Sequence, residues 1–96
     1  MAHFLGIYRP PRSTFHDDAT PEEEQAIGAH FHYLKRLLAE GKLILAGPCE
    51  DASMGLAVFE TQDEKEARDI VRVDPAVVAK VFTCEIKPYR VSLLRK

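Results

Sequence analysis

The sequence has no tryptophan, two cysteines and five glycines, and no apolar run of membrane-spanning length. A transmembrane helix needs about 20 mostly apolar residues, so we expect no contact with a membrane. The first residues also lack the basic start and long apolar stretch of a secretory signal. Cys49 and Cys84 stand far apart without a CxxC pair, unlike a zinc site or a disulfide framework. We therefore expect a reduced, cytoplasmic protein.

An excess of one charge is also missing. The 15 acidic and 13 basic residues are interspersed and give a net charge of −2, whereas a nucleic-acid binder shows a basic patch or stripe. The one basic cluster, at 90–96, is typical of a solvated terminus. The glycines form no phosphate loop and the serines lie in no nucleophile elbow. We expect no nucleic-acid partner and no cofactor.

What the sequence does contain is a regular order of elements. At 96 residues it predicts a single domain that covers positions 1–96. The expected elements are a strand at 3–8, a helix at 20–40, strands at 42–48 and 55–60, a helix from 61 through 71, and a strand at 80–91. This βαββαβ order predicts an α+β fold of the ferredoxin-like type, with a four-stranded antiparallel sheet and two helices on one face. The stretch at 9–18, with two prolines, reads as a loop.

Cap residues indicate where the two main helices begin and end. Thr20 is a good N-cap, Pro21 follows at the first helical position, and Glu23 completes a capping box. Gly41 is placed to end this helix in a left-handed conformation. The spacing of Thr61 and Glu64 predicts a second capping box.

The first three strands are apolar on both faces, although an antiparallel sheet with one solvated face should alternate. Two helices cover only one face of such a sheet. We therefore expect the other face to pair with a second copy of the chain as a homodimer, the commonest symmetric assembly. The alternative is an exposed apolar sheet face.

His30 interrupts an apolar helix face. The expected core stripe of that helix consists of Ile27, Phe31, Leu34 and Leu38. At about 100° per residue, His30 and Leu37 flank this stripe, whereas His32 points away from it. A histidine on a packed face suits proton chemistry, but it can equally be a hydrogen-bonded core residue. No two histidines have the i, i+4 spacing of a helical metal site, so we expect no metal.

Asp74 continues the inner face of the second helix and precedes Pro75. In a ferredoxin-like fold both helices pack on the same sheet face, so Asp74 and His30 can approach each other. A carboxylate beside an imidazole fixes its tautomer and orients it as a base. An Asp before a proline is also a common helix cap, and the two roles are compatible.

Several segments resemble the YciI-like (YCII-related) family. They are HxxYLxxLxxEGKL at 30–43, AGP at 46–48, Gly55, the Asp74-Pro75 pair and IKPYRV at 86–91. The resemblance implies a dimeric α+β barrel and an active site built on a histidine and an aspartate, which match His30 and Asp74. A related member is associated with dehalogenation of a chlorinated aromatic compound. Leu56 departs from the serine that members often carry, and the 9–18 loop is idiosyncratic.

These observations predict a small enzyme in which His30 and Asp74 perform acid–base chemistry on an unknown small organic molecule. The reaction classes are elimination, isomerisation and hydrolysis, and Tyr33 and Arg9 are candidate substrate contacts. A non-catalytic ligand-binding or accessory protein is the alternative. A cofactor-free monooxygenase of the same barrel class is a third reading, which the absence of tryptophan weakens slightly.

Overall fold

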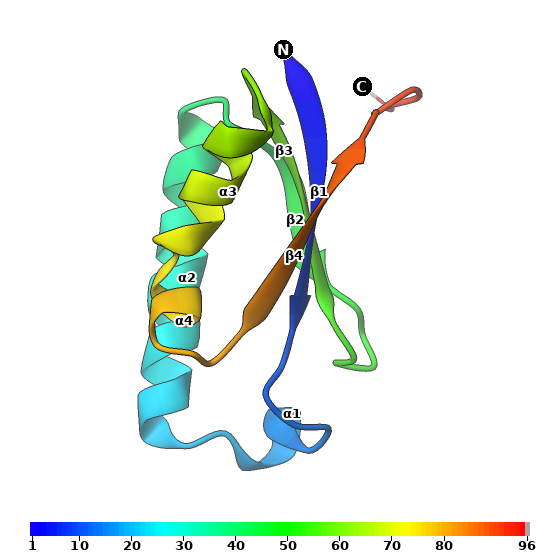
Figure 1. The fold of residues 1–96 in the computed structure, drawn as a ribbon. Helices are drawn as coiled ribbons and strands as arrows, with labels where there is room; N and C mark the ends of the chain where they lie inside the picture. Colours follow the sequence, from blue (N-terminus) through cyan, green and yellow to red (C-terminus); the bar gives the residue numbers. More distant parts are fainter. Residues whose placement is uncertain (96) are drawn as a thin grey trace.

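The computed structural model describes residues 1–95, so Lys96 of the basic tail lies outside the described residues. One antiparallel sheet has the strand order β2-β3-β1-β4, and the helices cover one of its faces (Figure 1). The strands are β1 (Ala2–Arg9), β2 (Leu43–Pro48), β3 (Gly55–Thr61) and β4 (Thr83–Tyr89), and the helices are α1 (Phe15–Asp18), α2 (Pro21–Ala39), α3 (Glu64–Arg72) and α4 (Pro75–Val78). The predicted ferredoxin-like α+β fold is confirmed.

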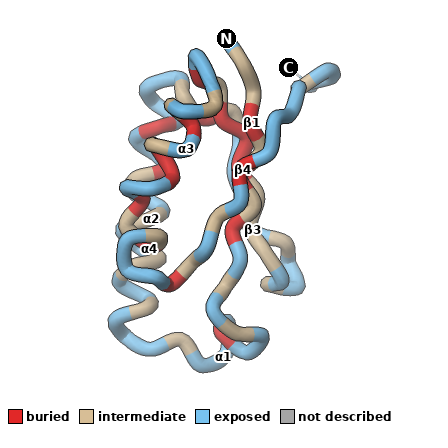
Figure 2. The backbone as a smooth tube through the Cα atoms, viewed as in Figure 1, coloured by how far each residue is buried: buried red, intermediate tan, exposed pale blue. Residues whose placement is uncertain are grey.

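The central strand β1 alternates between the two sheet faces. Phe4, Gly6 and Tyr8 are buried beneath the helices, whereas Leu5 and Ile7 point to the opposite side and are partly exposed. Figure 2 shows the buried stretches gathered where the helices face the sheet. The core joins Phe4 and Tyr8 to residues of the other three strands and of α2 and α3. Its buried members are Phe4, Tyr8, Leu34, Leu37, Leu43, Ala57, Phe59, Ala67, Ile70, Val71 and Ile86.

The caps of α2 form as the sequence predicts. The Glu23 N–H donates to Thr20 Oγ1 at 3.2 Å, and the Thr20 N–H donates to the Glu23 carboxylate at 2.9 Å. Gly41 has a φ of +79°, a conformation that glycine adopts without a steric cost.

The predicted cap of the second helix is wrong. Asp63 is the N-cap of α3, because its Oδ1 accepts the Glu66 N–H at 2.9 Å. Thr61 instead ends β3, is fully buried and donates its hydroxyl to the Asp63 carbonyl at 2.8 Å. Burial of Thr61 in the sheet makes its side chain unavailable as a helix cap.

The last strand also begins later than predicted, at Thr83 rather than Lys80. Lys80 has a φ of +62° and forms the left-handed turn that follows α4. The loop predicted at 9–18 contains the short helix α1, which buries Phe15. Both differences lie in turn segments, where hydrophobic residues do not recur with the period of a helix or a strand.

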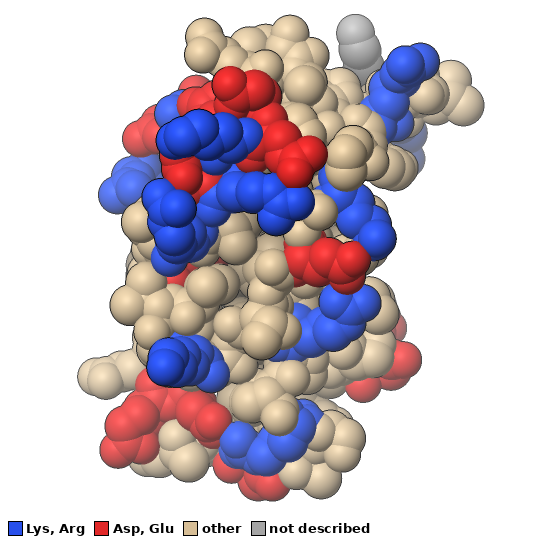
Figure 3. All heavy atoms as spheres, in the orientation of Figure 1, with Lys and Arg blue, Asp and Glu red and all other residues tan. Residues whose placement is uncertain are grey.

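Charges of both signs interleave on the face shown in Figure 3. Many of them pair within one helix turn, such as Lys65 with Asp69 at 2.9 Å and Arg68 with Glu64 at 2.7 Å. Among residues 1–95, no helix combines the length and the apolar character needed to cross a bilayer.

Gly6 provides a test of how tightly the sheet and its core are packed. A Cβ at Gly6 would lie 2.9 Å from the Phe59 ring and 3.4 Å from Cys84 Sγ. We therefore expect Gly6→Ala to lower the free energy of unfolding by about 1–3 kcal/mol through overpacking. Chemical denaturation measures this change.

The matched control is Gly28→Ala within α2, where a Cβ would meet nothing within 4 Å. Alanine is preferred to glycine in a helix interior by about 1 kcal/mol, so this variant should be at least as stable as the parent. Equal stability of the two variants would contradict the close packing at Gly6.

Candidate functional site

A cavity of about 710 Å³ lies between α2 and the β2–β3 hairpin, and the α1 segment closes one end. Ile27, Phe31, Leu34 and Leu38 all line it. The predicted core stripe of α2 is therefore mainly a cavity wall: Phe31 is 61% exposed and Leu38 is 53% exposed. Leu34 is the stripe residue that packs in the core, together with Leu37 at the side of the stripe, and the rest of the stripe extends beyond the edge strand β2.

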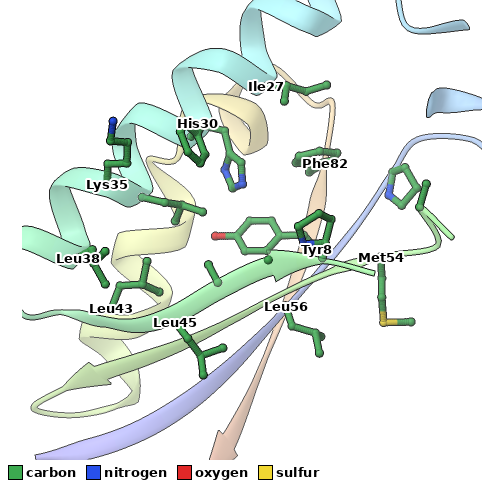
Figure 4. A pocket seen from close by; sticks show the side chains of 18 of the residues that line it. Tyr8, Ile27, His30, Lys35, Leu38, Leu43, Leu45, Met54, Leu56 and Phe82 are labelled. Atoms are coloured by element: carbon green, nitrogen blue, oxygen red, sulfur yellow. The ribbon is translucent and has the colours of Figure 1, made fainter. Parts of the chain in front are cut away.

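The remaining cavity walls come from several elements. The other lining residues are Tyr8, Pro10, Phe15, His16, His30, Lys35, Leu43, Ile44, Leu45, Ala46, Gly47, Pro48, Ala52, Met54, Gly55, Leu56 and Phe82. Figure 4 shows Tyr8 and His30 converging on the helix side of the sheet, with Leu45 and Leu56 on the other side of the strands. The hollow thus continues around the edge formed by β2.

His30 and Asp74 are brought together by α2 and the start of α4. His30 Nδ1 lies 2.7 Å from Asp74 Oδ2. The His30 side chain is 12% exposed and that of Asp74 is fully buried. The aspartate therefore lies behind the imidazole, which separates it from the cavity.

Three donors converge on the buried Asp74 side chain. Besides His30, the Tyr8 hydroxyl donates to Oδ2 at 3.3 Å and the Ala76 N–H donates to Oδ1 at 2.9 Å. The Ala76 contact is the helix cap expected of an aspartate before a proline. A carboxylate accepts hydrogen bonds and offers none, so this environment assigns the proton of the contact to His30 Nδ1.

That assignment fixes the His30 tautomer. With Nδ1 protonated, the lone pair of the neutral imidazole is on Nε2, on a side chain that lines the cavity. The ring meets Tyr8 and Phe82 edge to face, with centroid distances of 4.9 and 5.4 Å. A carboxylate on one nitrogen and aromatic rings at the sides are the arrangement of an oriented general base.

Tyr8 also belongs to this group, although it was not predicted from the sequence. Its side chain is 4% exposed, and burial, together with the nearby Cys84 and Asp74, raises the pKa of its hydroxyl above the ordinary value. Tyr8 is therefore a neutral donor to Asp74. The available signal was the alternation of β1, which places Phe4, Gly6 and Tyr8 on one face.

The loop that closes the cavity is held by Arg12. Its guanidinium makes two contacts of 2.8 Å with the Glu23 carboxylate and one of 2.8 Å with Asp18. Arg12, with the Thr20 cap, lowers the pKa of Glu23 to about 2. Phe15 from the same loop packs on Phe82, with ring centroids 5.8 Å apart.

Neither predicted substrate contact reaches the cavity. Tyr33 donates its hydroxyl to the Ile70 carbonyl at 2.7 Å and so joins α2 to α3. Arg9 ends β1 on the opposite sheet face, where it pairs with Glu85 at 3.0 Å. His32 is exposed on α2 and lies beside Phe31, on the side that the helical phase predicts.

The cysteines have no partners of their own kind. Cys49 and Cys84 are free thiols, and burial raises the pKa of Cys84 to about 12, which makes it a weak nucleophile at neutral pH. Within residues 1–95, no three His, Cys, Asp or Glu side chains gather in a way that could hold a metal ion.

Known proteins resemble this chain in structure and in sequence. The structure resembles that of 5-chloro-2-hydroxyhydroquinone dehydrochlorinase from Burkholderia phenoliruptrix AC1100 in complex with 2,5-dihydroxybenzoquinone. The TM-score is 0.65 and the identity is 22%, over 91% of this chain and 93% of that one. This likeness supports the fold.

Sequence comparison is more specific. The chain is 32% identical over 69 residues to the uncharacterized protein YjpA of Bacillus subtilis (strain 168), which covers 72% of this chain and 81% of YjpA. The sequence model of the YCII-related domain family matches residues 1–90 of this chain. With nearly the whole sequence matched, the chain belongs to the YCII-related family.

Proposed function

We propose that this protein is a small-molecule enzyme in which His30 acts as general base and then as general acid, with Asp74 as its positioning partner. The 2.7 Å contact between His30 Nδ1 and the buried Asp74 carboxylate carries the proposal. This contact leaves Nε2 as the basic nitrogen of a side chain in the cavity wall. Tyr8 is a second positioning residue, since its hydroxyl holds the same carboxylate oxygen.

Elimination is the favoured reaction class among elimination, isomerisation and hydrolysis. His30 Nε2 would remove a proton from the substrate, the released electron pair would form a new π bond, and a neighbouring group would leave with its bonding electrons. The dehydrochlorinase named above is the structural neighbour that favours this class. In an isomerisation no group leaves, and His30 instead returns the proton to a different atom of the same molecule.

The cavity walls support this chemistry because they are almost entirely apolar. The rings of Tyr8 and Phe82 contact the His30 ring edge to face, and Phe15 packs on Phe82. Exclusion of water strengthens the interaction between the Asp74 carboxylate and the imidazolium that forms when His30 accepts a proton. A flat cyclic molecule with an ionisable hydroxyl or a carbonyl suits such a site.

We also propose a homodimer through the sheet face opposite the helices. The apolar part of this outer face consists of Leu5, Ile7, Leu45, Leu56 and Val58, of which Val58 is already buried. Leu45 is 47% exposed, and ion pairs such as Arg9 with Glu85 lie along the β4 side. An apolar patch with a polar rim is typical of an interface. A cytoplasmic location stays a prediction, based on the two free thiols.

Substitution of the two helix histidines separates the proposed base from a surface residue. We expect His30→Gln to lower turnover at least 100-fold, the lower range for loss of a general base. His32→Gln should change it less than twofold, because His32 is exposed and outside the cavity lining. Chloride release from 5-chloro-2-hydroxyhydroquinone and related ring compounds measures turnover.

Unfolding curves of both histidine variants control for stability. Equal loss of activity from the two substitutions, at equal stability, would contradict the assignment of His30. Binding of the ring compounds without turnover in the parent protein would favour the non-catalytic reading.

Asp74→Asn tests the positioning role without any substrate. Asparagine keeps the oxygen that caps α4, but its amide would donate toward His30 Nδ1. We expect the His30 tautomer to invert, so that Nε2 carries the proton and loses its basic lone pair. The ¹⁵N chemical shifts of the ring nitrogens report this directly, and an unchanged tautomer would contradict the proposed pairing.

Sedimentation equilibrium tests the dimer. We expect a species of twice the 10.8 kDa chain mass at micromolar concentration. Ile7→Lys should shift it toward the monomer, because a charge would enter the outer face. Leu93→Lys is the control, since Leu93 is 95% exposed in the tail. A parent protein that sediments only as a monomer would refute the proposal.

A further inference from the structure

The ionisable side chains with charged forms at neutral pH that line the cavity are all basic, although His16 lies 3.5 Å from the Asp17 carboxylate just outside the lining. The lining includes three side chains that can carry a positive charge, His16, His30 and Lys35, but no Asp or Glu, although the chain contains 15 acids. Asp74 contacts the hidden nitrogen of His30 and does not line the cavity. The cavity lining therefore combines an apolar interior with basic side chains and no acidic ones.

Lys35 is the permanent charge among the three. Its ammonium lies 5.6 Å from the centre of the Phe31 ring, and among the described residues no carboxylate comes within 4.0 Å of it. Lys42, Lys65 and Lys87 each pair with a glutamate or an aspartate, whereas Lys80, like Lys35, has no such partner among the described residues. Figure 4 shows Lys35 at the rim, with its amine turned outward from the cavity.

We infer that the cavity selects an anionic amphiphile, a molecule with an apolar body and a carboxylate or ionised hydroxyl that Lys35 holds at the rim. This inference rests on the proposed function, because it names the class of molecule for that same site. The apolar body lies between the stripe of α2 and the β2–β3 hairpin. The flexible four-carbon stem of Lys35 allows its ammonium to turn from the Phe31 ring toward the anion.

The chemistry of the walls favours an anion over a cation or a neutral analogue. An ammonium group on the ligand would meet His16 and Lys35 without any carboxylate in the lining. An anion gains attraction from Lys35 at a rim where the apolar surface of Phe31 and Leu38 reduces screening by water. A cavity of about 710 Å³ lies within the usual range for small-molecule sites, with room for more than one ring.

Three probes of one shape test the inference: 2-naphthoate, 2-naphthylmethanol and 2-naphthylmethylamine. We expect naphthoate to bind about fivefold more tightly than the alcohol at pH 7, the gain of an ion pair at a partly exposed site. The amine should bind most weakly. Titration followed by amide NMR shifts gives each Kd and locates each probe, with Gly47, Gly55 and Phe82 as reporters of the cavity.

Lys35→Met removes the charge and keeps the apolar stem. It should abolish the preference for naphthoate and leave the affinity for the alcohol unchanged, whereas the control Lys65→Met, on α3 outside the cavity, should change neither. Equal binding of acid and alcohol, or an unchanged preference in Lys35→Met, would overturn the inference while the His30 tests stand. If none of the three probes binds, both the inference and the assignment of the cavity as a ligand site are overturned.

Discussion

The buried carboxylate of Asp74 is the constraint on which the site depends. A charge removed from water is costly unless hydrogen-bond donors surround it. Here the donors come from three separate elements: Tyr8 from β1, His30 from α2 and Ala76 from α4. The position of each donor is set by the same acceptor, so sheet and helices are aligned by the group that orients the imidazole.

Helix α2 contributes residues to two surfaces, the core and the cavity wall. Leu34 and Leu37 bury one side against the sheet, whereas Phe31 and Leu38 extend past the edge strand and line the cavity. A helix with a wider apolar face than the core can cover is usual for a partner or ligand site. The boundary between the two surfaces falls beside His30, which explains why an imidazole there is partly buried and still borders the cavity.

Much of this architecture could be predicted from the sequence, because local chemistry specifies it. Thr20, Glu23 and Gly41 define α2 through contacts within a few residues. The predicted fold allowed His30 and Asp74 to approach each other, since both helices had to cover the same sheet face, and the 2.7 Å contact comes from the structure alone. The role of those two residues is still a prediction.

Other features depend on contacts that no local pattern contains. Thr61 looked like a helix cap, but pairing of β3 with β1 buries it, and Asp63 takes its place. The stripe on α2 was correctly recognised as apolar, yet what it faces depends on the width of the sheet. Arg9 was a candidate substrate contact, but the alternation of β1 places its side chain on the sheet face opposite the helices.

The cavity wall is divided between elements anchored in the core and surface loops, and this division affects how such a protein can change during evolution. His30, Asp74 and Tyr8 come from regular elements anchored in the core, whereas much of the opposite boundary comes from the Arg12-bound loop and the β2–β3 hairpin. Surface loops accept insertions and substitutions at little cost to stability. The loop side of the cavity can therefore change during evolution while the His30, Asp74 and Tyr8 group and the scaffold that holds it stay intact.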